Sequence, residues 1–109
     1  MKIDIPERGD IVVLNFSPIV GHEQGGKRPA IVISEANFNC GGMAFMCPIT
    51  STERGHFFEV EIRTENTRGV ALVPQLTSID FVARKAKIVD KVDRKTLEEV
   101  LDKVKIILE

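Results

Sequence analysis

The sequence contains no tryptophan and no tyrosine, and its only aromatic side chains are six phenylalanines. So few rings argue against extensive stacking of nucleic acid bases on aromatic side chains, as typical single-strand binders use. No apolar run reaches the roughly 18 residues of a membrane-spanning helix. The first residues also lack the apolar segment of a secretion signal. We therefore expect a protein that makes no contact with a membrane.

Cysteines are equally scarce. Cys40 and Cys47 are the only two, too few for a disulfide framework, which favours the reducing cytoplasm as the compartment. Both thiols are expected to be buried as small apolar side chains. They are not at a zinc-ligand spacing with one another, and His22 and His56 lie far from them in the sequence. The sequence therefore predicts no metal site and no cofactor.

The sequence also has no clear excess of positive or of negative charge. Fifteen Lys and Arg residues stand against 16 Asp and Glu residues, for a net charge of −1, so global charge does not indicate a strongly basic nucleic acid binder. Basic residues do gather locally, at Lys27 and Arg28 and again within residues 81–89, which contain no acid. With 43% hydrophobic and 28% charged residues, the chain is typical of a soluble globular protein. Its 109 residues predict a single domain over residues 1–109.

Most of the chain is patterned as short strands separated by glycine-containing turns. Residues 30–34 form a continuous apolar run, which predicts a strand buried on both faces, whereas residues 58–62 alternate and predict one buried face. Pro48 cannot donate a ladder hydrogen bond, so it is expected near a strand end or at a sheet edge. The predicted strands are residues 10–16, 30–34, 43–50, 58–62, 69–76 and 86–89.

The periodicity becomes helical near the C-terminus. Apolar residues at helical spacing predict one amphipathic helix over residues 94–108. Two N-caps compete: Thr96 matches a capping box, whereas Asp93 places apolar residues at both positions of a hydrophobic staple. We favour Asp93, because Thr96 would put Lys95 where the staple requires an apolar residue.

Many short strands followed by one helix predict a mainly β (α+β) fold. The expected form is a small antiparallel barrel, or a strongly bent sheet, closed by the C-terminal helix. Residues 17–29 would then form a connection longer than the roughly 2–5 residues of a compact hairpin loop. A long polar loop is a place to look for function.

The segment over residues 20–30 combines flexible glycines with polar and charged side chains, namely His22, Glu23, Gln24, Lys27 and Arg28. Backbone N–H groups at glycines and a guanidinium fork suit the recognition of phosphate. The spacing does not match a P-loop, and a strand rather than a helix follows, so that motif is excluded. A solvated loop whose glycines serve a turn would have the same composition.

Two clusters of polar side chains follow predicted strands. One is Thr50, Ser51 and Thr52, and the other runs from Gln75 to Ser78. Hydroxyl groups can donate to phosphate oxygens, but they are also ordinary turn formers. His56 is interpreted most simply as a loop residue.

Together these segments resemble the MazF/PemK toxins of bacterial type II toxin–antitoxin systems. The matching segments are residues 8–11, 21–24, 27–30, 48–50 and 75–80, followed by the amphipathic helix. Each segment alone is a weak signal, whereas the ordered series, which covers nearly the whole chain, is specific. The resemblance implies an SH3-like antiparallel barrel of the kind shared with CcdB, and a homodimer. It also implies sequence-selective, metal-independent cleavage of single-stranded RNA, which would inhibit translation and growth.

The resemblance also implies roles for individual residues. Arg28 and Thr50 map onto the residues most closely tied to catalysis, and Glu23, Gln24 and Gln75 map onto substrate contacts. Relatives can carry serine in place of His22, which leaves its role open. The complete set of candidates is Arg28 and Thr50 for catalysis; Glu23, Gln24, Lys27, Ser51, Gln75 and Ser78 for substrate binding; and His22 or Glu23 as proton carrier.

The expected partners are single-stranded RNA, including mRNA, and a MazE-like antitoxin with an acidic, disordered C-terminal tail. Contact with DNA is expected only through the antitoxin. Two alternatives stay open: a CcdB-like protein that poisons a topoisomerase, and a non-catalytic SH3-like module that binds RNA or a peptide. The pairing of Arg28–Pro29 with Pro48–Thr50 favours RNA cleavage.

The chemistry of RNA cleavage supports these roles. RNA carries its own nucleophile, the 2′-OH group beside the scissile phosphate, and attack by it leaves 2′,3′-cyclic phosphate and 5′-OH ends. Arg28 suits stabilisation of the added negative charge. Because a guanidinium group holds its proton far above neutral pH, it is a poor general base.

Overall fold

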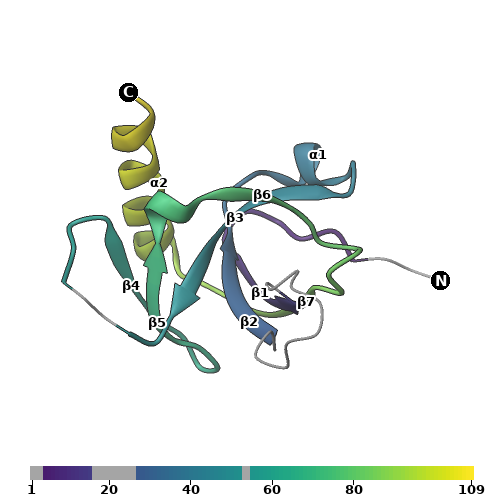
Figure 1. Ribbon diagram of the computed structural model, residues 1–109, viewed down its shortest axis with the longest axis horizontal. Helices are drawn as coiled ribbons and strands as arrows, with labels where there is room; N and C mark the ends of the chain where they lie inside the picture. Colours follow the sequence, from purple (N-terminus) through teal and green to yellow (C-terminus); the bar gives the residue numbers. More distant parts are fainter. Residues whose placement is uncertain (1–3, 16–26, 53–54) are drawn as a thin grey trace, which may run out of the picture.

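The computed structural model describes residues 4–15, 27–52 and 55–109 of the chain (Figure 1). The strands are β1 (Asp10–Asn15), β2 (Lys27–Val32), β3 (Met43–Thr50), β4 (Glu59–Arg63), β5 (Arg68–Leu72), β6 (Thr77–Asp80) and β7 (Lys87–Lys91). The helices are α1 (Ala36–Asn39), the 3₁₀ helix η2 (Val73–Gln75) and α2 (Arg94–Leu108). This mainly β architecture with one long C-terminal helix confirms the predicted fold class.

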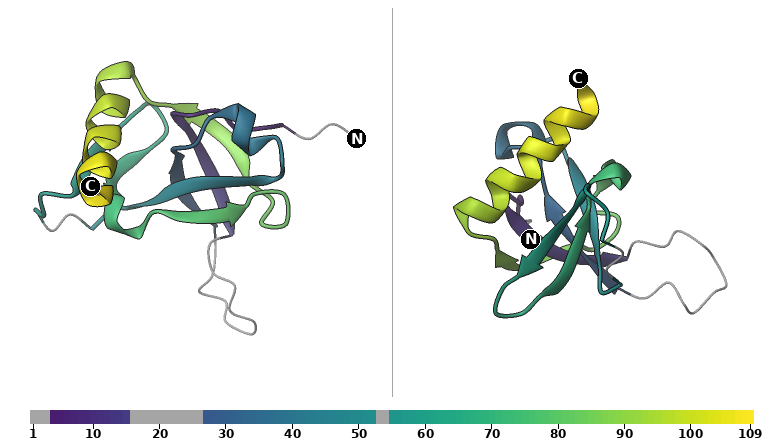
Figure 2. Two further views of the ribbon diagram at one scale, coloured as in Figure 1. Left: turned by 90° about the horizontal axis from the view of Figure 1, so that it is seen from above. Right: turned by 90° about the vertical axis from the view of Figure 1, so that its left-hand side faces the viewer.

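The strands form one antiparallel sheet in the order β4–β5–β3–β2–β1–β7, with β6 also paired to β3. The sheet curls strongly, as the two views of Figure 2 show. The curl brings the turn between β4 and β5 against β7. In that turn Asn66 donates from its backbone N to Asp90 Oδ2 at 3.1 Å and from its side chain to Val89 O at 3.3 Å. The two ends of the sheet are therefore joined at the β4–β5 turn.

Apolar side chains cover both faces of the central strands. Ile31 belongs to a cluster on the face that α2 covers, and Ala30 and Val32 belong to a second cluster on the other face. All three side chains are fully buried. The prediction of a strand buried on both faces is confirmed, because α2 and the curled sheet cover one face, while Ile79 of β6 and Phe81 after it cover the other.

Helix α2 begins and ends at the predicted residues. Asp93 is its N-cap and accepts a hydrogen bond from Thr96 N at 2.8 Å. Val100 and Val104 are buried, but Ile107 and Leu108 at the end of the apolar stripe are 41% and 72% exposed. Only the earlier turns of the stripe therefore pack against the sheet. No helix in the described residues is long and apolar enough to cross a membrane.

Several strand boundaries differ from the predictions. Strand β2 begins at Lys27, three residues earlier than expected, so Lys27 and Arg28 lie on a strand. The strand predicted over residues 69–76 ends at Leu72, because η2, with a proline in its first turn, follows directly. The short elements α1 and β6 were not predicted. One helical turn is too short to show a period, and β6 buries a single apolar side chain.

The cysteines divide between surface and core. Cys47 in β3 is buried, as predicted, and burial raises the pKa of its thiol to about 12. The prediction for Cys40 is wrong, because this residue lies exposed at the end of α1. The single turn of α1 directs it to solvent, where it donates to Asn37 O.

Pro48 lies two residues before the end of β3, as expected. Phe45 directs its N–H and C=O groups toward β2, to Ser34 Oγ and Ile33 N. Backbone groups alternate along a strand, so the missing N–H of Pro48 faces the opposite side. On that side β3 changes partner from β6, which ends its pairing at Met46, to β5, which begins at Ile49. The proline therefore interrupts no hydrogen bond with either strand.

Candidate functional site

Arg28 and Thr50 lie at the same end of the β2–β3 pair. The last register pair at this end joins Ala30 to Pro48. Arg28 is two residues before Ala30 and Thr50 is two residues after Pro48. Because side chains alternate along a strand, both face the side of the sheet away from α2. Arg28 is exposed and Thr50 is half-buried. The two predicted catalytic residues are therefore both accessible to solvent, at the same end of the same face of the sheet.

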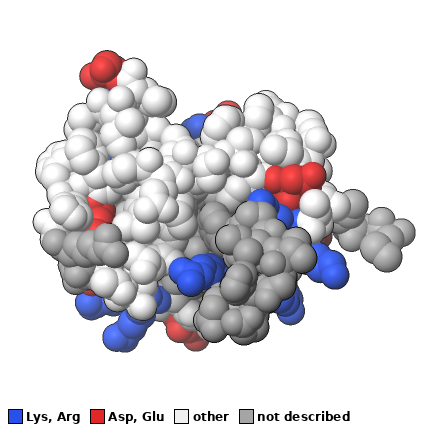
Figure 3. Space-filling model, in the orientation of Figure 1, with Lys and Arg blue, Asp and Glu red and all other residues white. Residues whose placement is uncertain are grey.

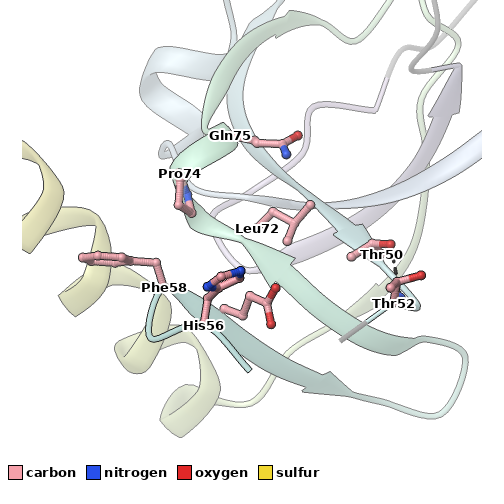
Figure 4. Close-up of a pocket in the computed structure, with 8 residues that line it drawn as sticks. Thr50, Thr52, His56, Phe58, Leu72, Pro74 and Gln75 are labelled. Carbon is pink, nitrogen blue, oxygen red and sulfur yellow. Dashed lines mark hydrogen bonds between the residues drawn. The ribbon is translucent and has the colours of Figure 1, made fainter. Parts of the chain in front are cut away.

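A cavity of about 320 Å³ opens at Thr50. Figure 4 shows Thr50 and Thr52 at one end, His56 and Phe58 at the other, and Leu72 between them. Gln75, a predicted substrate-binding residue, also lines this cavity, from η2. Its lining residues are Thr50, Thr52, His56, Phe58, Glu59, Leu72, Pro74 and Gln75. Hydroxyl, amide, imidazole and carboxylate groups thus surround a partly apolar floor.

Two contacts fix the position of Thr50. Thr52 N donates to Thr50 Oγ1 at 3.2 Å, which leaves the hydroxyl hydrogen of Thr50 available for a ligand. On the neighbouring strand β5, a Cβ atom added to Gly69 would overlap the Thr50 carbonyl oxygen and lie 3.1 Å from Ile49 Cγ2. The close approach of β5 to Thr50 therefore requires glycine at this position.

His56 and Glu59 are the cavity residues that sequence reasoning missed. Gly55 N donates to Glu59 Oε1 at 3.1 Å, and Glu59 N donates to His56 O at 3.1 Å. These bonds form the turn that leads into β4, with Gly55 at a φ of 74°. His56 does lie in a loop, as interpreted, but it also lines the cavity. The alternation of apolar and polar residues over 58–62 was a partial signal for Glu59, because it places Glu59 on the face opposite Val60.

The remaining predicted residues lie elsewhere. Ser51 is exposed directly after Thr50. Ser78 lies on β6 opposite Phe45 of β3 and does not line the cavity. Lys27 lines a separate groove, because it and Arg28 face opposite sides of β2. His22, Glu23 and Gln24 lie outside the described residues.

Two groups of opposite charge, a guanidinium and a carboxylate, lie at or beside the cavity. Arg28 lies at its end of the sheet and Glu59 lies in its wall. Within residues 4–15, 27–52 and 55–109, no three His, Cys, Asp or Glu side chains are grouped so that they could hold a metal ion. A phosphate group at this site would be met by the guanidinium and hydroxyl groups of the protein.

Comparison with known proteins identifies the family of this chain. A family model described as the PemK-like, MazF-like toxin of type II toxin–antitoxin systems matches residues 7–108. The chain belongs to this toxin family. It is 40% identical over 111 residues to the endoribonuclease toxin ChpB of Escherichia coli K12, across 94% of each chain. It is 34% identical over 105 residues to the endoribonuclease toxin MazF of the same strain, across 95% of each chain.

Solved structures agree with this assignment. A crystal structure of MazF from Deinococcus radiodurans superposes with a TM-score of 0.86 at 38% identity, over 97% of this chain and 98% of that one. A MazE–MazF structure from the same organism gives a TM-score of 0.90 at 38% identity, over 97% of both chains. A mycobacterial endoribonuclease in complex with its cognate antitoxin shares the fold, with a TM-score of 0.76 at 15% identity. The predicted MazF-like architecture is confirmed.

Proposed function

We propose that this toxin is a sequence-selective endoribonuclease that cuts single-stranded RNA, including mRNA, in the cytoplasm and thereby inhibits translation and growth. The observation that carries the proposal is the placement of Arg28 and Thr50 at one end of the sheet, beside a cavity that also contains Gln75. Sequence similarity to the endoribonuclease toxins ChpB and MazF, at 40% and 34% identity, supports the same activity.

The reaction uses the nucleophile that RNA itself carries. The 2′-oxygen forms a bond to the adjacent phosphorus, and the bond from phosphorus to the 5′-oxygen breaks. The 2′-OH loses its proton to a base and the departing 5′-oxygen gains one. The products are a 2′,3′-cyclic phosphate and a 5′-OH end, and no step requires a metal ion or a cofactor.

Arg28 stabilises the negative charge that develops on the phosphate oxygens. A guanidinium group offers several donors in a rigid fork, and it stays charged throughout the reaction. Thr50 donates its hydroxyl hydrogen to a non-bridging oxygen, since its oxygen already accepts from Thr52 N. His22 and Glu23 remain the proposed proton carriers.

Substrate contacts surround these two residues. Gln75 in the cavity wall has an amide that can both donate and accept hydrogen bonds, which suits the edge of a base. Ser51 extends the row of hydroxyl groups that begins at Thr50. The proposed substrate-binding set is Glu23, Gln24, Lys27, Ser51, Gln75 and Ser78.

The protein is proposed to act as a homodimer. Phe38 of α1 and Phe45 of β3 lie with ring centroids 5.6 Å apart and are 51% and 39% exposed, and Met43 beside them is 37% exposed. The adjacent strand β6 pairs with β3 alone among the described strands, so its outer edge offers unpaired backbone groups. A second copy would cover both the apolar side chains and the edge. Ser78 on β6 would then lie near the subunit interface.

A MazE-like antitoxin is the second proposed partner. Its acidic, disordered tail would fold on binding and occupy the positions of the RNA phosphates, so that antitoxin and RNA compete. Contact with DNA would come only through the antitoxin. The solved MazE–MazF structure of Deinococcus radiodurans supports a partner of this kind.

The chemistry is tested with a matched pair of oligonucleotides. One is an RNA containing a mapped cleavage site, and the other carries a single 2′-deoxy substitution at the cleaved nucleotide. In excess EDTA the protein should cut the first, leave cyclic phosphate and 5′-OH ends, and bind the second without cutting it. Ends that carry 5′-phosphate, or cleavage of the 2′-deoxy oligonucleotide, would contradict attack by the 2′-OH group.

A further inference from the structure

A second groove lies where the edge strand β7 meets the β4–β5 turn. It has a volume of about 690 Å³ and is lined by Lys27 of β2, Arg68 of β5 and Lys87 of β7, with Asn66 and Thr67 beside them. These cations are far apart in the sequence and converge because the sheet curls until its two ends meet. The basic character of the groove is therefore a product of the fold rather than of one sequence segment.

The three cations are available for a ligand. Lys27, Arg68 and Lys87 are exposed, and none of them forms an ion pair with another described residue. By contrast, Arg63, the register partner of Arg68 on β4, is paired with Glu61 at 2.8 Å. Cations that share a groove repel one another, and an anion that binds there removes this repulsion.

Asp90 is an acidic residue next to the groove. Asp90 accepts hydrogen bonds from Asn66 N at 3.1 Å and from Lys91 N at 2.9 Å. A hydrogen bond from the Thr64 side chain is the main cause that lowers its pKa, so the carboxylate is ionised at neutral pH. It fixes the β4–β5 turn and offsets part of the positive charge.

The positive surface continues beyond this groove. Lys87 also lines an adjoining cavity of about 330 Å³, together with Lys85 and one acidic residue, Asp4. Both lysines belong to the acid-free segment 81–89. Figure 3 shows Lys and Arg side chains, with acidic side chains among them, along the lower rim of the molecule. The groove and the adjoining cavity thus form a track rather than an isolated spot.

The groove is connected to the catalytic end through β2. Lys27 and Arg28 are consecutive, with Arg28 on the face of Thr50 and Lys27 on the face of the groove. A nucleic acid strand carries a phosphate at every nucleotide on either side of the scissile one. A strand whose scissile phosphate lies at Arg28 can therefore pass the end of β2 and reach Lys27.

We propose that this groove binds the phosphodiester backbone of RNA outside the cleaved segment, through Lys27, Arg68 and Lys87. The inference rests on the proposed ribonuclease function and extends it to flanking RNA. Backbone contacts of this kind add affinity without reading sequence. The groove would favour long RNA chains over short fragments, and so favour mRNA over cleavage products.

The test uses the double variant Arg68→Gln/Lys87→Gln. The control variant is Lys95→Gln/Lys105→Gln, which removes two exposed cations from α2. The probes are two oligonucleotides with the same cleavage site and a 2′-deoxy group at the cleaved nucleotide, one short and one extended on both sides. Each lost contact to single-stranded nucleic acid lowers the slope of log K against log salt concentration by about 0.7, so the double variant should lose about 1.4 on the extended probe. The slope on the short probe, and its rate of cleavage as all-RNA, should not change.

Several results would overturn the groove assignment. An unchanged slope on the extended probe is one, and equal loss by the control variant is another. Weaker binding of the antitoxin with unchanged RNA binding would assign the groove to a protein partner instead. Failure of the wild-type protein to bind or cut any RNA would instead refute the ribonuclease function itself, and this outcome is distinguishable because it appears before any groove variant is made.

Discussion

Replacing Gly69 by alanine should displace Thr50 and reduce both RNA cleavage and stability. The new Cβ atom would overlap the Thr50 carbonyl oxygen and approach both Thr50 C and Ile49 Cγ2 to 3.1 Å. Strand β5 and the end of β3 would have to separate to relieve these contacts. Overpacking of this kind costs about 1–3 kcal/mol of unfolding free energy. A displacement of about 1 Å at a catalytic group can lower the rate by about 100-fold.

The matched control is Gly41→Ala. Its Cβ would lie 3.7 Å from Phe38 O, an ordinary van der Waals contact, so both stability and cleavage should stay close to wild type. Urea unfolding measures the stability of each variant, and single-turnover cleavage of RNA measures the rate. The reasoning is refuted if Gly69→Ala is as stable and as active as wild type, or if it loses stability while its cleavage rate is unchanged.

Three further predictions concern separate features. Arg28→Ala should lower RNA cleavage by at least about 100-fold and change the free energy of unfolding by no more than about 0.5 kcal/mol. Arg28→Lys should restore little activity, because the fork geometry is lost. A folded, fully active Arg28→Ala protein would remove this residue from the mechanism. Hydrogen bonds from the Thr96 side chain and backbone N–H lower the pKa of Asp93, so its stabilising effect is present at neutral pH and is lost as the pH falls through the folded-state pKa. Asp93→Ala should therefore lower the urea midpoint at pH 7 and have a smaller effect at pH 2; an equal effect at both values would contradict this. A thiol reagent at pH 8 should modify Cys40 in the folded protein and Cys47 only after unfolding, because burial raises the pKa of Cys47 to about 12; mass spectrometry distinguishes the two.

The parts of the fold with a strong period could be predicted from sequence. Helix α2 was predicted to the residue because its apolar spacing and the Asp93 cap indicate the same start. The strand around Ile31 was also predicted, although its first residues, Lys27 and Arg28, were assigned to a loop because they are polar. Elements α1 and β6 are too short to display a period. Tertiary contacts with β3, rather than local sequence, define both of them.

The candidate site could be predicted in part. The resemblance to MazF/PemK toxins pointed to Arg28, Thr50 and Gln75, and the structure brings Thr50 and Gln75 to one cavity. His56 was not selected, because a histidine in a loop has no distinguishing local pattern. Its place in the same cavity as Thr50 depends on the pairing of β3 with β5 and of β5 with β4. The groove at Lys27 was missed for the same reason, since its three cations meet only when the sheet curls.

The central claim is that the protein cuts RNA by itself at the site formed around Arg28 and Thr50. The most direct measurement is incubation of total RNA with the purified protein in excess EDTA, followed by sequencing of the new 5′-OH ends. Wild-type protein should produce a discrete set of ends that share a short sequence, and Arg28→Ala and Thr50→Val should not produce them. Absence of new ends with the wild-type protein, or the same ends with both variants, would contradict the account.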